Sequence, residues 1–593
     1  MTAALLALVL AAAAETPVPE TPVAAALRAE VARAMDSLQL EGIEKPYYIS
    51  AVVTEETGLS AEAVAGCAVP VRAGRDRSLE VTVRVGSYSL DQSGFESGAS
   101  RRGAGKVAAN FPLDDEPMVM RRAVWLAIDR AYKQAGTVYA AKRAFLDSRG
   151  SGASLKYADF AKEDVAQARL ASVPPPLDRA RAEALARRLS KALGGDDAVR
   201  GRVRVLGLTQ RRTFVDSEGA SVDTASSWVG VEAAAWAEAA DGMPVRDVYG
   251  RYVTDLDALP PAETLERAMV ELSLSVREAA LAEELDEPYL GPVLFEGPAA
   301  AEAVFLLLAD NVSEPRQPLF GAGDQGPSSE WASRQGGRVL DRSLSLIDDP
   351  SLKLRNGVPI ISSYDFDLEG VAAKPVSLVE KGILKDYVRT RRPRKGATNS
   401  NGHARSLGGS APQLGAVAMP STLVLSAGEG ASSPEAVRAR FLEEIKARDL
   451  PFGLIVRKLD DDSIEQLGAT DALDQIEGQM DNSRPSALTP PVEVWKLLRD
   501  GQEERVRGVR WGAVRALALR DVLAVTPPTA PESIVNFVLV SDLDYTRDGA
   551  LNANAVPVSA VAPGMLLLEE AEMQPLRGPF ARLPLLGPRP EAP

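Results

Sequence analysis

The chain has 593 residues, of which 45% are hydrophobic and 25% charged, a composition typical of soluble globular proteins with several cores. The formal net charge of −15 argues against a nucleic-acid-binding surface, because such surfaces need clustered cations. The single cysteine, Cys67, excludes an intrachain disulfide and has no adjacent histidine, so we expect a small buried apolar residue rather than a nucleophile.

The N-terminus resembles an export signal. Residues 3–14 are an uninterrupted Ala, Leu and Val run, and residues 15–22 form a Pro-rich linker. We therefore expect a signal peptide over 1–14 and an exported, periplasmic or secreted protein, although no Lys or Arg precedes the apolar run. A misassigned start codon or a simple Ala-rich N-terminus remains the alternative. No later stretch has the roughly 20 apolar residues that a transmembrane helix needs.

Residues 23–200 are expected to form an N-terminal α/β domain. Apolar residues recur at helical spacing in three segments, and one segment alternates apolar and polar residues as strands do. The predicted helices cover 23–40, most of 114–149 and 177–195, and the predicted strand covers 79–90.

A hairpin-rich middle region is expected over 201–289, closed by a helix at 263–285. A β-rich domain then follows over 290–575, and a Pro-rich tail over 576–593. Within the β-rich domain we expect one helix after Ser433, which would be its N-cap with Pro434 in the first turn. The sequence RDGQ at 499–502 is predicted to be a hairpin turn. The fold class is therefore α+β, with a mainly antiparallel C-terminal domain.

Three motifs suggest sites but lack essential parts. A dinucleotide site requires a strand before its Gly-rich motif and a helix after it. The sequence around GAGDQG at 321–326 predicts neither. The DFDLEG sequence at 365–370 resembles half of a calcium loop, but Val376 occupies the position of the bidentate glutamate. The basic run RTRRPRKG at 389–396 is expected to be a solvated loop.

The acids of DFDLEG are expected on one face of a strand that ends in a tight turn, with a cation or arginine cluster nearby to offset their repulsion. They are Asp365, Asp367 and Glu369. The only histidine, His403, lies in a polar, Gly-rich segment, and any Ser–His–Asp triad would have to use it. We expect a hydrogen-bonding surface residue, able at most to assist general acid–base chemistry.

The stretch LSLIDDPSLKLRNGVPIISSYDFDLEGVAAKPVSLVEKGILKDYVRTRRP resembles the C-terminal domain of the TldD/PmbA family, the two-component zinc metallopeptidases also called TldD/TldE. The resemblance rests on the IDDP turn at 347–350, the Y-x-x-D-x-E-G segment at 364–370 and the strand pair at 378–387. The SNGHAR sequence at 400–405 is similar to the Gly- and Asn-rich loop of the family.

This resemblance implies an α/β N-terminal region, a β-rich C-terminal domain, and a dimer around an enclosed cavity. In the peptidase branch it implies a helix with H-E-x-x-x-H, which supplies two zinc ligands and a general base, and a late cysteine as third ligand. Laid over that motif, residues 301–306 match at Glu302, but Ala301 and Leu306 stand at the histidine positions. The late cysteine is also missing, so we expect no zinc cofactor and a chain closer to the PmbA/TldE branch.

Three functions follow from the resemblance. The first is a catalytically inactive partner or scaffold of a peptide-processing complex, as a homodimer or a heterodimer with a TldD-like paralogue. The second is an active metallopeptidase with a non-standard metal site built from Glu302, His403 and the three acids of DFDLEG. The third is an exported module that binds peptides or cell-wall material.

The candidate site residues are few. Glu302 is the relict of a catalytic base, and we expect its main role to be structural, because glutamate is favoured near a helix N-terminus. The candidates for a substrate groove are Asp365, Asp367, Glu369, Asn401, His403 and Arg405.

Overall fold

The structure, a computed structural model, describes residues 19–95, 105–149, 157–170, 172–194, 199–313, 329–394, 396–406, 416–461, 464, 486–539, 543–545, 551–553, 555–578 and 580. The expected signal peptide, the GAGDQG motif and most of the Pro-rich tail lie outside these residues. None of the helices in the described ranges has the length and apolar character needed to cross a membrane.

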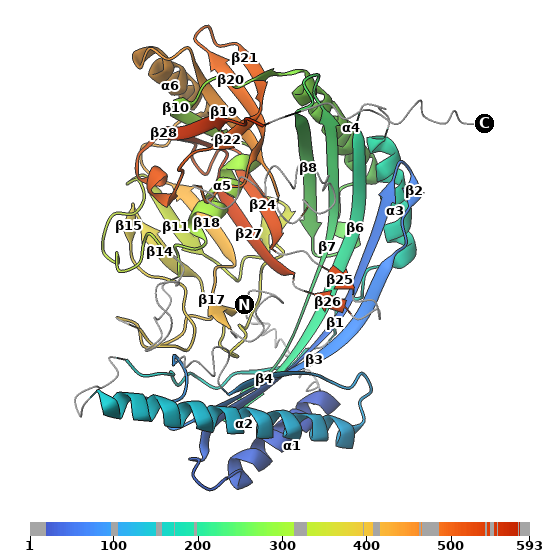
Figure 1. Cartoon of the computed structure of the whole chain (residues 1–593), viewed down its shortest axis with the longest axis vertical. Helices are drawn as coiled ribbons and strands as arrows, with labels where there is room; N and C mark the ends of the chain where they lie inside the picture. Colours follow the sequence, from blue (N-terminus) through green and yellow to red (C-terminus); the bar gives the residue numbers. More distant parts are fainter. Residues whose placement is uncertain are drawn as a thin grey trace, which may run out of the picture.

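The N-terminal half is built on one long, curved sheet with the order β4-β3-β1-β6-β7, extended along β7 by β5 and β8 and along β1 by β2 (Figure 1). Its strands are β1 (Pro46–Val64), β2 (Cys67–Ala68), β3 (Arg72–Val85), β4 (Lys106–Asn110), β5 (Gln167–Ala168), β6 (Arg200–Asp216), β7 (Ser221–Glu238) and β8 (Pro244–Val253). Because β1 pairs with both β3 and β6, the regions expected as 23–200 and 201–289 share a single sheet, and they form one unit rather than two.

Four helices cover one face of this sheet: α1 (Pro22–Ser37), α2 (Pro117–Ser148), α3 (Arg179–Leu193) and α4 (Ala262–Leu281). Alternation along β1 explains the layering, since successive side chains point to opposite faces. Ile49 and Val53 pack with α1 and α2, and Ala61 packs with α3 and α4. Val52, on the other face, packs against a cluster around Phe214 that Phe366 of the C-terminal domain also contacts.

The helices expected in this half are confirmed, with shifted ends. The strand expected over 79–90 begins earlier, at Arg72, and stops at Val85. Gly86 has a φ of 103°, and a Cβ there would lie 2.5 Å from the Leu90 carbonyl oxygen. The chain therefore turns at Gly86 in a conformation that favours glycine.

Cys67 is exposed, so the expectation of burial is wrong. It opens β2 just after a tight turn at Ala65 and Gly66, both with positive φ. The turn is held against α3, where the Gly66 N–H donates to the Ser190 hydroxyl at 3.0 Å, and the Cys67 side chain faces solvent.

The C-terminal half contains two larger sheets with α5 (Pro298–Leu308) between them, on the opposite side of the long sheet from α3 and α4 (Figure 1). The first sheet has the order β22-β28-β10-β19-β20-β21-β9, and β23 pairs with β28. Its strands are β9 (Glu283–Glu284), β10 (Tyr289–Glu296), β19 (Phe452–Leu459), β20 (Pro491–Leu498), β21 (Glu503–Arg507), β22 (Val509–Trp511), β23 (Val522–Val525) and β28 (Met565–Pro575).

The second sheet has the order β15-β14-β11-β18-β27-β24: β11 (Leu344–Asp348), β14 (Val376–Glu380), β15 (Ile383–Leu384), β18 (Thr422–Ala427), β24 (Glu532–Leu539) and β27 (Val556–Pro563). Short pairs are β12 (Leu354–Arg355) with β13 (Val358–Pro359), β16 (Ala404–Arg405) with β17 (Val417–Ala418), and β25 (Leu543–Tyr545) with β26 (Leu551–Ala553). Most pairings in both halves are antiparallel, so the molecule is α+β as expected.

Two local predictions in this half are confirmed. Helix α6 (Pro434–Ala447) begins after Ser433, whose hydroxyl accepts a hydrogen bond from the Ala436 N–H at 3.3 Å. The RDGQ sequence joins β20 to β21 as a hairpin turn, with Gly501 at a φ of 90°.

Candidate functional site

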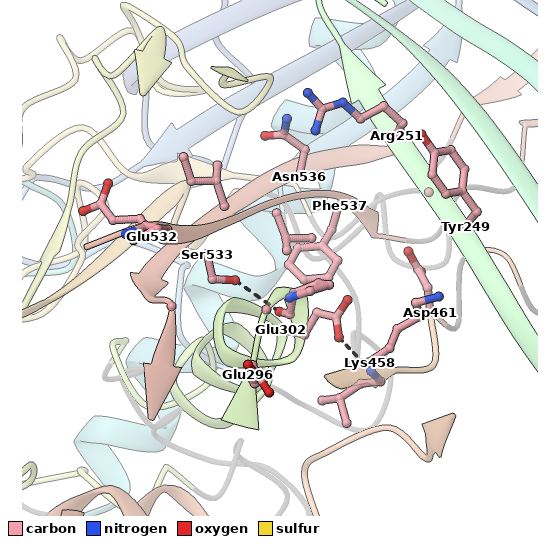
Figure 2. A pocket seen from close by; sticks show the side chains of 18 of the residues that line it. Tyr249, Arg251, Glu296, Glu302, Lys458, Asp461, Glu532, Ser533, Asn536 and Phe537 are labelled. Carbon is pink, nitrogen blue, oxygen red and sulfur yellow. Dashed lines mark hydrogen bonds between the residues drawn. The ribbon is translucent and has the colours of Figure 1, made fainter. Parts of the chain in front are cut away.

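A cavity of about 750 Å³ lies where the two halves of the molecule meet. It is bordered by β8 of the long sheet, the N-terminal end of α5, the end of β19, and β24 (Figure 2). Its polar lining residues are Tyr249, Arg251, Tyr252, Glu296, Glu302, Lys458, Asp461, Thr526, Glu532, Ser533 and Asn536. This volume is in the range of small-molecule and peptide sites, so the cavity is the first place to look for function.

Helix α5 reaches the cavity because of how it begins. Gly297 has a φ of 62°, which reverses the chain after β10, and Pro298 follows in the first turn. The helix is apolar on nearly all sides, which is typical of a helix buried on all sides. Its Ala301 N–H donates to the Ser533 hydroxyl of β24 at 3.2 Å, which fixes the helix against that strand.

Glu302 is the one acid of α5, and its side chain points into the cavity (Figure 2). A carboxylate oxygen accepts a hydrogen bond from the Leu459 N–H at 2.8 Å. Burial disfavours the charged form and raises the pKa of Glu302 to about 8, although the Leu459 N–H and the nearby Lys458 ammonium act in the opposite direction. The side chain is therefore mostly a neutral acid at pH 7.

This raised pKa has a consequence for stability. Between the ordinary value of 4.5 and about 8, the folded chain holds a proton on Glu302 that the unfolded chain releases, so rising pH destabilises the fold. We expect unfolding of the wild type and Glu302→Gln, compared at pH 5 and pH 8.5, to show the wild type losing about 4 kcal/mol relative to the variant. Equal losses in the two proteins would show that Glu302 ionises normally.

The zinc implied by the family motif does not fit α5. Ala301 and Leu306 carry no N, O or S donor in their side chains, and zinc requires such donors. Among the described residues, no group of three or more His, Cys, Asp or Glu side chains is placed to hold a metal ion. Glu302 and His403, which were expected as joint ligands, bind different partners: Glu302 accepts from the Leu459 N–H, and His403 pairs with Asp348.

The three acids of DFDLEG do not share the face of a strand, and that prediction is wrong. They lie in a loop between short bridges, because Asp367 caps local turns instead of pairing in a ladder. Asp367 accepts hydrogen bonds from the Glu369 and Val371 N–H groups, and burial together with Glu369 raises its pKa. Asp365 is exposed and forms an ion pair with Lys353 at 3.4 Å.

His403 is fully buried, so the expectation of a surface histidine is wrong. Its Nε2 lies 2.9 Å from the Asp348 Oδ2, and its Nδ1 lies 2.9 Å from the Asn401 carbonyl oxygen. Gly402, with a φ of 78°, lets the loop press against Ala372, where a Cβ would meet the carbonyl oxygen at 2.4 Å. The loop is thus folded inward, and the His403 ring has one partner close in sequence, Asn401, and one distant partner, Asp348.

The other groove candidates from this loop are also engaged. The Asn401 side chain accepts from the Arg389 N–H and donates to the Tyr387 carbonyl oxygen. The Arg405 guanidinium donates to the Pro420 and Pro557 carbonyl oxygens, at 2.7 and 2.6 Å. Of the sequence-derived candidates, only Glu302 lines the cavity.

The basic run at 389–396 is not a solvated loop. Arg391 is only 2% exposed, and its Nη2 donates to a Glu218 carboxylate oxygen at 2.6 Å. Its guanidinium lies 4.1 Å from the centre of the Phe160 ring. The run therefore joins the C-terminal domain to the long sheet, with partners that sequence proximity does not indicate.

The remaining cavity residues were missed because no motif marks them. Tyr249 and Arg251 belong to β8, and Ser533 and Asn536 to β24, in segments that resemble ordinary strands. Lys458 pairs with Asp247 at 2.8 Å, and Asp247 also accepts from the Ser275 hydroxyl. The only signal near these positions in the sequence is that polar residues recur along β8 and β24, which is common in ordinary strands.

Fold and site together define a two-part α+β protein with a cavity at the junction and a helix without zinc ligands beside it. Residues 292–447 match the model of the PmbA/TldA metallopeptidase C-terminal domain. A metalloprotease of Archaeoglobus fulgidus is 37% identical over 75 residues, which are 13% of this chain and 16% of that protein. The match thus spans about a sixth of the relative's length.

Solved structures share the fold over nearly the whole chain. TldE from Thermococcus kodakarensis superposes with a TM-score of 0.55 at 13% identity, covering 93% of this chain and 100% of that one. A Thermotoga maritima protein described as a modulator of a DNA gyrase gives 0.54 at 14% identity, covering 89% and 96%. A Bacteroides thetaiotaomicron protein with the same description gives 0.51 at 13% identity, covering 93% and 99%. The family is therefore matched in sequence over residues 292–447, and nearly the whole chain shares the fold of these solved structures.

Proposed function

We propose that this chain is a member of the TldD/PmbA family that does not hydrolyse peptides by itself and acts as partner or scaffold in a peptide-processing complex. The observation that carries the proposal is α5, where Glu302 is present but Ala301 and Leu306 stand at the zinc-ligand positions. A homodimer or a heterodimer with a TldD-like paralogue fits this role. Export to the periplasm or medium follows from the apolar run at 3–14.

The environment of Glu302 also supports an inactive chain. A general base must be ionised at the working pH to take a proton from water. With a pKa of about 8, Glu302 is mostly protonated at neutral pH. Because Ala301 and Leu306 offer no donor for a metal that would lower the pKa of water, the protonated Glu302 by itself supplies neither a base nor an activated nucleophile.

The first test is the metal content and activity of the purified full chain. After incubation with excess zinc and dialysis, we expect well under one zinc per chain and no hydrolysis of unstructured peptides, for both the wild type and Glu302→Gln. Zinc near one per chain, with hydrolysis abolished by Glu302→Gln, would overturn the proposal in favour of an active metallopeptidase. Co-purification of a paralogue that carries H-E-x-x-x-H would distinguish a partner from a free-standing binding module.

A second candidate, a module that binds peptides or cell-wall material, is favoured by the borders of the cavity. Strand β8 pairs only with β7, and β24 pairs only with β27, so both are edge strands in the described sheets. Both line the cavity. An extended peptide can add to such an edge through its main chain. Binding of an unstructured peptide by the isolated chain, with no cleavage, would support this role.

A further inference from the structure

The charged groups around the cavity are nearly all paired within the protein. Glu296 accepts from Arg438 and Arg457, at 2.8 and 3.3 Å. Glu532 accepts from the Arg355 guanidinium at 2.8 and 2.6 Å. Each of these acids therefore has a compensating cation and adds little net negative potential to the cavity.

Two further lining groups add little net charge. Lys458 pairs with Asp247 at 2.8 Å, and Glu302 is mostly neutral at pH 7. At Glu296, Glu532 and Glu302, a negatively charged ligand entering the cavity therefore meets little repulsion that is not already offset.

Arg251 differs from all of these residues. Its guanidinium has no hydrogen bond or ion pair with any residue that the structure describes, and its Nε is buried without a partner. It lies on edge strand β8 beside Tyr249 (Figure 2). Burial raises the pKa of Tyr249, and the nearby Arg251 charge acts in the opposite direction. An arginine held at a cavity wall without a counter-charge is costly, because a buried donor without a partner loses its hydration.

We propose that Arg251 is the anion anchor of this cavity and that its ligand is a carboxylate carried by an extended peptide. The inference rests on the peptide-binding role proposed above and specifies the chemistry that the site recognises. A guanidinium matches a carboxylate with two parallel N–H···O bonds, which is the strongest pairing available to this side chain. The peptide main chain would lie along the β8 and β24 edges, and its carboxylate would supply the charge that Arg251 lacks.

The carboxylate can come from the peptide C-terminus or from an acidic side chain. Three fluorescently labelled hexapeptides of alanine, serine and valine distinguish the sources: a free C-terminal acid, a C-terminal amide, and an amide with one internal glutamate. Their dissociation constants are measured by anisotropy with the full chain at fixed salt. We expect at least one carboxylate form to bind about 10- to 100-fold more tightly than the neutral amide.

Arg251→Gln is expected to lower the affinity of the carboxylate peptide to that of the amide and to leave the affinity of the amide unchanged. Arg251→Lys should retain part of the preference, because the charge remains while the paired geometry is lost. Arg122→Gln, at an exposed arginine on α2, is the matched control and should change neither affinity. Thermal unfolding of each variant checks that the fold is kept.

Two results would overturn the inference in distinguishable ways. Equal affinity for acid and amide forms, or a carboxylate preference that survives Arg251→Gln, would remove Arg251 as anchor and leave peptide binding standing. Failure of every peptide to bind would remove the peptide-binding role together with the anchor. If Arg251→Gln does not fold, the acid-to-amide ratios of the wild type and Arg251→Lys decide.

Discussion

Asp348→Ala is expected to lower the free energy of unfolding by about 3–5 kcal/mol, because it leaves His403 without the charge buried beside it. Both side chains are fully buried. The Asp348 carboxylate also accepts hydrogen bonds from the Ser421 and Thr422 N–H groups, at 3.0 and 2.7 Å. The substitution thus leaves several buried N–H donors without their acceptor. Urea unfolding, followed by fluorescence and circular dichroism, measures the loss.

The pH dependence gives a second check on the same pair. Hydrogen bonds from His403 and the two N–H groups lower the pKa of Asp348 despite its burial. A carboxyl with a lowered folded pKa stabilises the protein above its unfolded pKa of about 3.9, and this stability is lost as pH falls through the folded value. The gap between wild type and Asp348→Asn should therefore narrow below about pH 4.

Glu380→Ala is the control for Asp348. Glu380 is exposed and lies 3.7 Å from the Lys385 ammonium, so its loss should change stability by less than about 0.5 kcal/mol. If Asp348→Ala and Glu380→Ala cost the same, the buried pair is not important for stability.

Arg391→Ala should destabilise the protein by about 3–5 kcal/mol, because it removes one partner of a buried charged pair between the two halves. The Arg391 Nη2 also donates to the Ala161 carbonyl oxygen at 2.8 Å, so the substitution removes the cation paired with Glu218 and a donor to that carbonyl. We expect faster hydrogen exchange in 157–162 and 389–394 as well as a lower urea midpoint.

Lysine at this position should restore little, because a compact ammonium cannot reproduce the planar guanidinium on the Phe160 ring. Arg342→Ala, at an exposed arginine, is the control and should leave the urea midpoint nearly unchanged. Full stability in Arg391→Lys would contradict the role assigned to the planar contact.

The site could be predicted only in part. The resemblance located α5 and its missing histidines, and the apolar sequence of α5 correctly indicated a core helix. The amino-acid sequence could not identify β8 and β24 as the strands that border the cavity opposite Glu302. These strands are about 285 residues apart in sequence and carry no shared motif. A cavity between two domains depends on how the domains pack, and residue patterns within either domain do not encode that geometry.

Features that depend only on neighbouring residues could be predicted from the amino-acid sequence. Apolar periodicity located α1 to α4, Ser433 and Pro434 placed the start of α6, and Gly501 marked a turn. These are local effects of side-chain spacing, capping and backbone freedom, which act within a few residues.

The burial of the polar residues could not be predicted in this way, because it depends on contacts between distant segments. His403 and Arg391 occur in polar, Gly-rich or basic segments that predicted exposure, yet their partners Asp348 and Glu218 lie 55 and 173 residues away. Burial of a charge is stable only when a partner meets it in three dimensions. For the same reason, the lack of a partner at Arg251 became visible only in the folded chain.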